Sequence, residues 1–241
     1  HAKGRKMKLK VSREKLGLAL QKVNSIISSR TTLQVLSNVL LEAEAGKLVL
    51  TTTDLDVRIQ TQVDADVESE GKTTLPGRKF HQIVRELYGQ EVLLECDDNH
   101  HMGITCASSH FKILGLTAED FPLPLEMNEL RRFTLTQDEL SRMLNLISYS
   151  VSQEDSRKAL NGILFSVTEN NFTTVATDGR RLALVEKMID DFAGEDGDSI
   201  IPVKSAAELI KLLSKNGKAS VEIGEGMARF VLDEHTIMHS K

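Results

Sequence analysis

The second half of this chain repeats the first, and this duplication limits the possible folds more than any other feature of the sequence. Over residues 9–63 the chain matches, without gaps, a stretch of itself 124 residues further on, so that Thr53-Asp54 recurs as Thr177-Asp178. The match then continues after two residues are inserted in the second copy. Few residues are identical, but the apolar positions agree almost throughout. Such a repeat predicts two domains of one fold.

Each copy is expected to hold two helices packed on antiparallel sheets, a fold of the α+β class. Apolar residues recur at helical spacing after a candidate N-cap, Ser12, in the first copy, and after the capping-box pair Thr136 and Glu139 in the second. Residues 48–63 and 172–185 are rich in β-branched side chains broken by short polar turns, which predicts antiparallel strands. A second helical period and further strands complete each copy.

We place the first domain at residues 7–122 and the second at 123–241, with an extended, proline-containing linker at about 117–132. Residues 1–6 precede the first methionine and are interpreted as an added leader outside the fold. No stretch reaches the roughly 18 apolar residues of a membrane span, so we expect a cytoplasmic chain with no membrane partner.

The charge of the chain limits how it could bind nucleic acid. There are 30 Lys and Arg residues against 35 Asp and Glu residues, which gives a formal net charge of -5 at pH 7. A uniformly basic coat is therefore excluded. Any DNA-binding surface has to be a local patch.

The second helix of each copy carries the best candidate for that patch. Arg78 and Arg85 lie seven residues apart on the face opposite the apolar stripe, and Lys204 and Lys211 take the equivalent positions in the second copy. An ordinary solvated helix face is the alternative, because exposed helix surfaces are usually charged. Repetition at equivalent positions in an acidic chain favours a basic surface that binds phosphates without reading sequence.

The two Thr-Asp pairs could supply acids for metal-dependent phosphodiester chemistry. Each pair, however, follows a predicted strand and precedes a turn, where Asp commonly accepts hydrogen bonds from nearby backbone. No phosphate-binding glycine loop and no Ser, His and Asp set stands out. We therefore predict no catalytic site, no metal and no cofactor. A metal-dependent DNA-modifying enzyme with Asp54 or Asp178 as metal ligand remains the alternative, and a protein scaffold without a DNA role is a third possibility.

Two cysteines and two histidines near one predicted hairpin are given a structural interpretation. Cys96 and Cys106 could face each other across the hairpin, but free thiols are expected in a cytosolic chain. His100 and His101 are adjacent and lack any metal-ligand spacing, so we interpret them as part of a solvated turn.

The segments KALNGILF, TVATDGRRLAL, LPGRKF, TTTDLDV and SIIPVKS, together with the twofold repeat, resemble the bacterial DNA sliding clamp, the beta subunit of DNA polymerase III. The resemblance spans Met7 to Lys241. It implies a duplicated clamp fold from a family in which three such domains form one chain. Two chains then close head to tail into a ring, with helices lining the hole and sheets outside. On this basis a third domain is absent from the chain.

The function implied by the resemblance is that of a processivity factor, a non-catalytic subunit of the DNA-directed DNA polymerase holoenzyme. Such a clamp encircles double-stranded DNA independently of sequence as a homodimer, and it binds short peptides of DNA polymerases and the clamp loader. The resemblance also implies a dimer interface at Phe111 and Ile113, although Phe111 could instead pack within its own sheet.

The resemblance assigns DNA contacts to the loop after the first helix of each copy. Where some relatives have a glutamine in the second copy this chain has Glu154, so Gln153 or Arg157 is the expected substitute. With the basic helix faces, the expected DNA-binding residues are Arg30, Arg78, Lys79, Arg85, Arg157, Lys204 and Lys211.

The peptide cleft of the family lies between its second and third domains. The wall on the second domain is expected at Leu160, Thr177, Gly179, Arg180, Arg181 and Leu182. Arg180 departs from the histidine common in relatives, which would alter peptide preference. Leu160 and Leu182 could alternatively be core residues.

Overall fold

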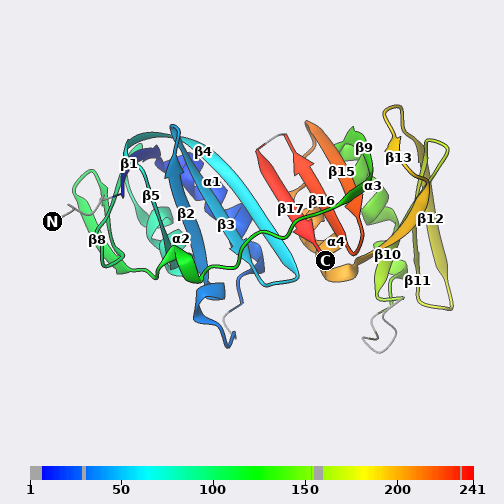
Figure 1. The fold of residues 1–241 in the computed structure, drawn as a ribbon, viewed down its shortest axis with the longest axis horizontal. Helices are drawn as coiled ribbons and strands as arrows, with labels where there is room; N and C mark the ends of the chain where they lie inside the picture. Colours follow the sequence, from blue (N-terminus) through cyan, green and yellow to red (C-terminus); the bar gives the residue numbers. More distant parts are fainter. Residues whose placement is uncertain (1–6, 29–30, 153, 155–159, 234) are drawn as a thin grey trace. The chain divides into compact units, whose positions relative to one another are not determined.

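A computed structural model describes residues 7–28, 31–152, 154, 160–233 and 235–241 of the chain. It divides into two compact units, residues 1–124 and 125–241 (Figure 1). No helix in the described part is long and apolar enough to cross a membrane.

The elements of the first unit are β1 (Met7–Ser12), α1 (Arg13–Val23), η1 (Asn24–Ile26), η2 (Gln34–Ser37), β2 (Asn38–Glu44), β3 (Lys47–Thr53), β4 (Val57–Ser69), β5 (Gly71–Pro76), α2 (Gly77–Glu86), β6 (Glu91–Cys96), β7 (His101–Cys106), β8 (Ser109–Leu114) and η3 (Ala118–Asp120). All of the strand pairs are antiparallel, in the orders β5-β2-β3-β4 and β4-β1-β6-β7-β8. The long β4 belongs to both half-sheets. Helix α1 packs on β4, β3 and β1, and α2 packs on α1, β2 and β5.

The elements of the second unit are β9 (Glu129–Thr136), α3 (Gln137–Ile147), η4 (Ser148–Ser150), β10 (Gly162–Thr168), β11 (Asn171–Thr177), β12 (Leu182–Met188), β13 (Ala193–Gly194), β14 (Gly197–Pro202), α4 (Val203–Leu212), β15 (Lys218–Gly224), β16 (Met227–Leu232) and β17 (Thr236–Ser240). Its antiparallel orders are β14-β10-β11-β12 and β13-β9-β15-β16-β17. These orders match those of the first unit strand for strand, which confirms the α+β fold and the duplication.

One difference separates the two copies. The counterpart of β4 is broken into β12 and β13, with Ile189 buried between them. The break lies in the region where the second copy carries its two inserted residues. The second unit therefore has two separate half-sheets among its described residues, whereas β4 joins those of the first.

The predicted helix starts are confirmed. Ser12 caps α1 by accepting a hydrogen bond from the Lys15 backbone N–H, and Thr136 and Glu139 form a full capping box at the start of α3. The apolar sides of these helices are buried, as Leu16, Leu20 and Val23 show for α1.

The range expected to form an extended linker has structure at both ends. Residues 118–120 form the 3-10 turn η3, and residues 129–132 already belong to β9. Phe121 is buried in the first unit against Val35, Leu36 and Leu40, because an aromatic side chain gains more from apolar contact than from solvent. The segment after β8 thus folds back onto its own unit, and Figure 1 shows it passing the end of β2.

Candidate functional site

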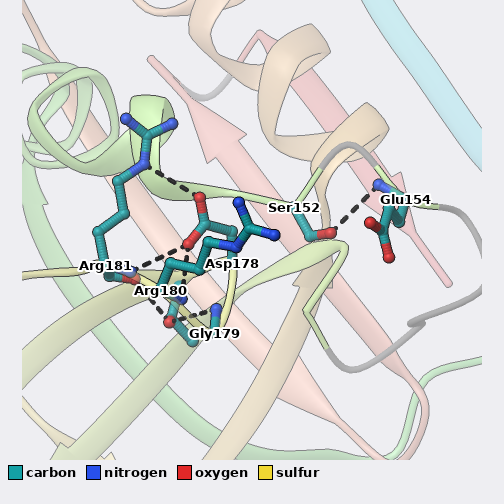
Figure 2. Close-up of polar contacts among 7 residues, drawn as sticks. Ser152, Glu154, Asp178, Gly179, Arg180 and Arg181 are labelled. Carbon is teal, nitrogen blue, oxygen red and sulfur yellow. Dashed lines mark hydrogen bonds and ion pairs between the residues drawn. The ribbon is translucent and has the colours of Figure 1, made fainter.

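The turn between β11 and β12 is held together by its own side chains. Thr177 Oγ1 donates to the Arg181 carbonyl at 2.7 Å and accepts from the Gly179 backbone N–H at 3.1 Å. One carboxylate oxygen of Asp178 accepts from the backbone N–H groups of Arg180 at 2.9 Å and Arg181 at 3.0 Å (Figure 2). These bonds, the Arg180 N–H first, hold the pKa of Asp178 below its usual value.

The first copy builds the same turn. Thr53 Oγ1 donates to the Val57 carbonyl at 2.9 Å and accepts from the Leu55 N–H at 3.1 Å, while Asp54 accepts from the Val57 N–H at 2.8 Å. Leu55 has a positive φ of 80°, where Gly179 has 86° in the second copy. Glycine adopts this conformation without the penalty that a side chain brings. The repeated threonines and aspartates therefore serve the turn.

Arg181 is held in place beside this turn. Its Nε donates to Asp178 Oδ2 at 3.0 Å, and its guanidinium carbon lies 5.4 Å from the centre of the Tyr149 ring. The side chain is largely exposed nonetheless. The result is a guanidinium fixed next to an exposed aromatic ring, with its charge partly offset by Asp178.

An apolar row, exposed at its two ends and half-buried in the middle, crosses the sheet next to the turn. Leu164 pairs with Val175 and with Ile200, and Val175 pairs with Leu184, so the four side chains lie in line on one face of β14-β10-β11-β12. Ile200 and Leu184 are each 50% exposed, and Leu182 at the turn is 62% exposed. Leu182 is therefore not a core residue. The apolar surface left exposed at Ile200, Leu184 and Leu182 makes this face a candidate interaction site.

The sequence predicts the turn but not this row. A sequence signal for the row exists, because apolar residues occupy both faces of β10, β12 and β14, whereas a half-solvated strand would alternate apolar and polar residues. Without the strand register, the outward positions could not be distinguished from the inward ones.

Leu160 lies half-buried just before β10, and its carbonyl accepts from the Ser152 N–H at 3.1 Å. Glu154 is exposed, and its backbone N–H donates to Ser152 Oγ at 3.1 Å (Figure 2). Gln153 and Arg157, the expected substitutes for the missing glutamine, lie outside the described residues, as does Arg30.

The basic face of α2 is exposed but unequal along its length. Arg78 Nη2 donates to the Ile27 carbonyl at 2.8 Å, so its side chain is tied to the loop after α1. Lys79 and Arg85 are exposed. Burial, followed by the charge of Arg85, lowers the pKa of His81 on the same helix. Of this helix, Lys79 and Arg85 offer positive charge to solvent most directly.

The equivalent face of α4 is also exposed. Lys211 forms an ion pair with Glu208 at 2.9 Å, three residues earlier on the helix, and this pair partly neutralises its charge. Lys204, two turns before Lys211, is exposed. The basic face thus exists in both copies, and Arg78 and Lys211 each make an internal contact.

The two residues expected at a dimer interface have different surroundings. Ile113 is 4% exposed and pairs with Met102, whereas Phe111 pairs with Ile104 and is 42% exposed. Ile113 therefore belongs to the core of its own unit, although Phe111, two residues earlier, lies on the same face of β8. Only Phe111 of this pair presents substantial apolar surface.

The cysteines and histidines of the β6-β7 hairpin do not form a site. Cys96 lies opposite Met102 rather than Cys106, and both thiols are free and buried. Among the described residues, no three His, Cys, Asp or Glu side chains gather as a metal site would need.

Family comparison matches the same two units. The sequence pattern described as DNA polymerase III beta subunit, N-terminal domain, matches residues 7–125, and that of the central domain matches residues 134–241. The chain belongs to this family. Its fold is the sliding clamp fold.

Individual relatives agree. The beta sliding clamp of Chlamydia muridarum is 36% identical over 215 residues, which cover 89% of this chain and 59% of the relative. The beta sliding clamp of Haemophilus influenzae is 32% identical over 237 residues, which cover 98% of this chain and 64% of the relative. The chain therefore spans less than two thirds of these relatives.

Solved structures of clamps superpose closely on the chain. The sliding clamp of Pseudomonas aeruginosa bound to griselimycin gives a TM-score of 0.92 at 31% identity, over 98% of this chain and 64% of that one. The clamp of Bacillus subtilis gives 0.93 at 25% identity with the same coverage.

Proposed function

We propose that this chain is the first two domains of a processivity factor, a clamp that encircles duplex DNA and holds polymerases to it. The observation that carries the proposal is the repeated basic face: the second helix of each clamp unit presents exposed Lys or Arg at equivalent positions in a chain of net charge -5. Net acidity with a local basic face suits a protein that surrounds DNA without binding it tightly.

DNA contact through these faces would be independent of sequence. Ammonium and guanidinium groups on exposed helices attract phosphates, and phosphates are the same at every base pair. From the geometry, the exposed Lys79 and Arg85 would contribute most on α2, while Arg78 would contribute less because its guanidinium already donates to the Ile27 carbonyl. On α4, Lys204 and Lys211 are the contributing residues, and the ion pair with Glu208 reduces the contribution of Lys211.

The peptide site of this proposal is the open side of the second unit. The row Leu164, Val175, Leu184 and Ile200, with Leu182 beside it, supplies apolar surface, and Arg181 supplies a fixed positive group. Short segments of DNA polymerases and of the clamp loader are the proposed ligands. Pockets of this kind bind a few apolar side chains and orient them with a few polar groups.

The proposed ring is a homodimer of the full-length protein, in which a third unit of the same fold would follow the present two. Phe111 and Leu114, 42% and 60% exposed on the edge strand β8, are apolar residues available to a head-to-tail contact in the first unit. The proposal places the ring in the cytoplasm.

No catalytic chemistry is part of this function. The carboxylates of Asp54 and Asp178 are committed to turn hydrogen bonds, so the observation that motivated a metal-dependent enzyme has a structural explanation. Turnover of DNA that requires a divalent ion would restore that alternative.

Leu182→Ala tests the peptide site in the full-length protein. Losing one leucine-sized contact is worth about 1.5 to 3 kcal/mol, so titration of a labelled polymerase peptide should show affinity reduced roughly tenfold or more. The melting temperature should stay nearly constant, since Leu182 is 62% exposed. Leu18→Ala, at a leucine 55% exposed on α1 of the other unit, is the matched control and should bind like the wild type. Equal affinity in all three proteins would remove the site from this face.

A further inference from the structure

In the first unit, the chain's own segment 117–124, here called the strap, packs against β2, β4 and β5. The Thr117 hydroxyl accepts from the Glu119 N–H at 3.3 Å, and the Phe121 N–H donates to the Ala118 carbonyl at 3.1 Å, which closes a 3-10 turn. This turn directs the Phe121 ring onto the sheet. Only 4% of Phe121 remains exposed, against a cluster formed by Val35, Leu36 and Leu40.

Arg58 on β4 clasps the strap. Its guanidinium carbon lies 5.6 Å from the centre of the Phe121 ring, and its Nη1 donates to the Pro122 carbonyl at 2.7 Å. Burial is the main cause that lowers the pKa of Arg58. The aromatic ring and the carbonyl that follows it are thus recognised by one side chain, in the way that a binding site recognises a ligand.

The strap does not fill the groove completely. A cavity of about 180 Å³ remains, lined by Leu40, Glu42, Arg58, Gln60, Lys72, Ala118 and residues 121–124. Beyond Pro122 the strap leaves the sheet, and Leu123 is 86% exposed. Phe121 is therefore the buried anchor of the strap, with Ala118 packed beside it on the same cluster.

This groove occupies the same place in the first unit as the open apolar face does in the second. The equivalent pairs are Leu36 and Leu160, Leu40 and Leu164, and Arg58 and Leu182. In both units the position lies beside the Thr-Asp turn and across the same strands. In the first unit Phe121 covers Leu36 and Leu40, whereas Leu182 of the second unit is exposed.

We propose that the first unit holds a second peptide groove and that the strap occupies it as an internal ligand. The groove takes a short segment with an aromatic residue followed by proline, and it becomes available to another peptide when the strap is displaced. The proposal rests on the proposed function only through the comparison with the second unit. The groove itself stands on the contacts of Phe121 and Arg58.

The strap fills the groove because it is covalently attached next to it. A segment tethered beside its site experiences an effective concentration on the order of millimolar, so even a weak contact stays occupied. A free peptide of the same sequence must compete with this concentration. Removing the Phe121 side chain removes the competition while leaving Arg58, Leu36 and Leu40 in place.

The experiment uses the full chain with labelled methyl groups and a synthetic peptide of residues 117–125 as the probe. In Phe121→Ala the peptide should produce saturable shifts of the Val35, Leu36 and Leu40 methyl signals, and the same peptide with alanine in place of phenylalanine should produce none. Wild type and the matched control Leu123→Ala should respond at least tenfold less at equal peptide concentration. Absence of saturable shifts in folded Phe121→Ala up to millimolar peptide would overturn the groove.

Arg58→Gln provides a second route if Phe121→Ala does not fold, because it leaves the apolar cluster intact and removes only the clasp. Hydrogen exchange at the Phe121 amide should accelerate at least tenfold, and the probe peptide should compete for the groove. Unchanged exchange together with no peptide response would refute the proposal. Neither result depends on the second unit, where wild-type binding of a polymerase peptide tests the proposed function separately.

Discussion

The exposed residues at the candidate peptide site are supported by closely packed, buried neighbours. Gly162 at the start of β10 is an example, because a Cβ there would lie 2.9 Å from the Ile201 carbonyl and 2.5 Å from the Ile200 side chain. Backbone at this distance cannot move aside without opening the β10-β14 pairing, in which Gly162 lies opposite Pro202. The glycine thus keeps β14, and with it Ile200, in register beside Leu164.

Gly162→Ala should lower stability by about 1 to 3 kcal/mol, the usual cost of overpacking a close contact. Gly103→Ala is the matched control, since a Cβ at that strand position would be 3.6 Å from its nearest neighbour, an ordinary contact. Urea unfolding of the two variants against wild type checks the difference. Equal stability of both variants would show that the β10-β14 contact yields more readily than its geometry indicates.

At the level of helices and strands, local features could be predicted from the sequence and tertiary contacts could not. The starts of α1 and α3 were predictable because a cap is a contact between residues three apart in the chain. The tie between Arg78 and the Ile27 carbonyl was not, since the partners are 51 residues apart and the pattern of one helix carries no trace of it. The split of the β4 counterpart and the folding back of Phe121 likewise depend on tertiary contacts.

The same limit applies to the candidate site. The Thr-Asp turn was recognisable from its residues, but the apolar row is a property of register across β14, β10, β11 and β12. Four separate segments contribute one residue each. No periodicity within a single strand specifies which residues of its neighbours lie beside it.

The ion pair at the start of α3 should make the stability of the fold depend on pH. Lys187 pairs with Glu139 at 2.7 Å, and Glu139 also accepts from the Thr136 N–H at 3.0 Å; the Lys187 hydrogen bond is the main cause that lowers the pKa of Glu139. A carboxyl group with a lowered folded-state pKa stabilises the fold above its unfolded-state pKa of about 4.3, and this contribution is lost as pH falls through the folded-state pKa.

Glu139→Gln should therefore cost up to about 1 kcal/mol at pH 7, a modest value because the pair is partly exposed. The difference from wild type should shrink as the pH falls below about 4. Chemical unfolding of both proteins at several pH values measures it, with Glu14→Gln in the first turn of α1 as the control. A difference that stays constant down to pH 3 would exclude ionisation of Glu139 as its source.

The chain consists of two copies of one unit, and both copies share the same surface charge feature. Each copy presents an exposed basic face on its second helix, although the chain as a whole is acidic. Binding through such faces should depend strongly on salt, because each phosphate contact releases condensed counterions.

Replacing Lys79, Arg85 and Lys204 with Glu in the full-length protein should weaken retention on DNA and lower the salt slope by about 0.9 for each true phosphate contact. Arg78→Gln and Lys211→Gln should change the slope less than replacement of Lys79 or Arg85, since these two side chains are tied to Ile27 and Glu208. DNA sequence should have no effect in any variant. If the triple variant kept the retention and the salt slope of the wild type, the basic faces would be solvated surface with no role in DNA binding.

Encirclement itself is measured by loading the full-length protein onto a nicked circular plasmid and then cutting the circle once. A ring that surrounds the duplex stays on the closed circle and slides off the new ends, so the bound protein should be lost on cutting while high salt alone removes little of it. Protein that remains equally bound to circular and linear DNA, or that salt removes from both alike, would contradict a topological clamp and leave only ordinary phosphate binding.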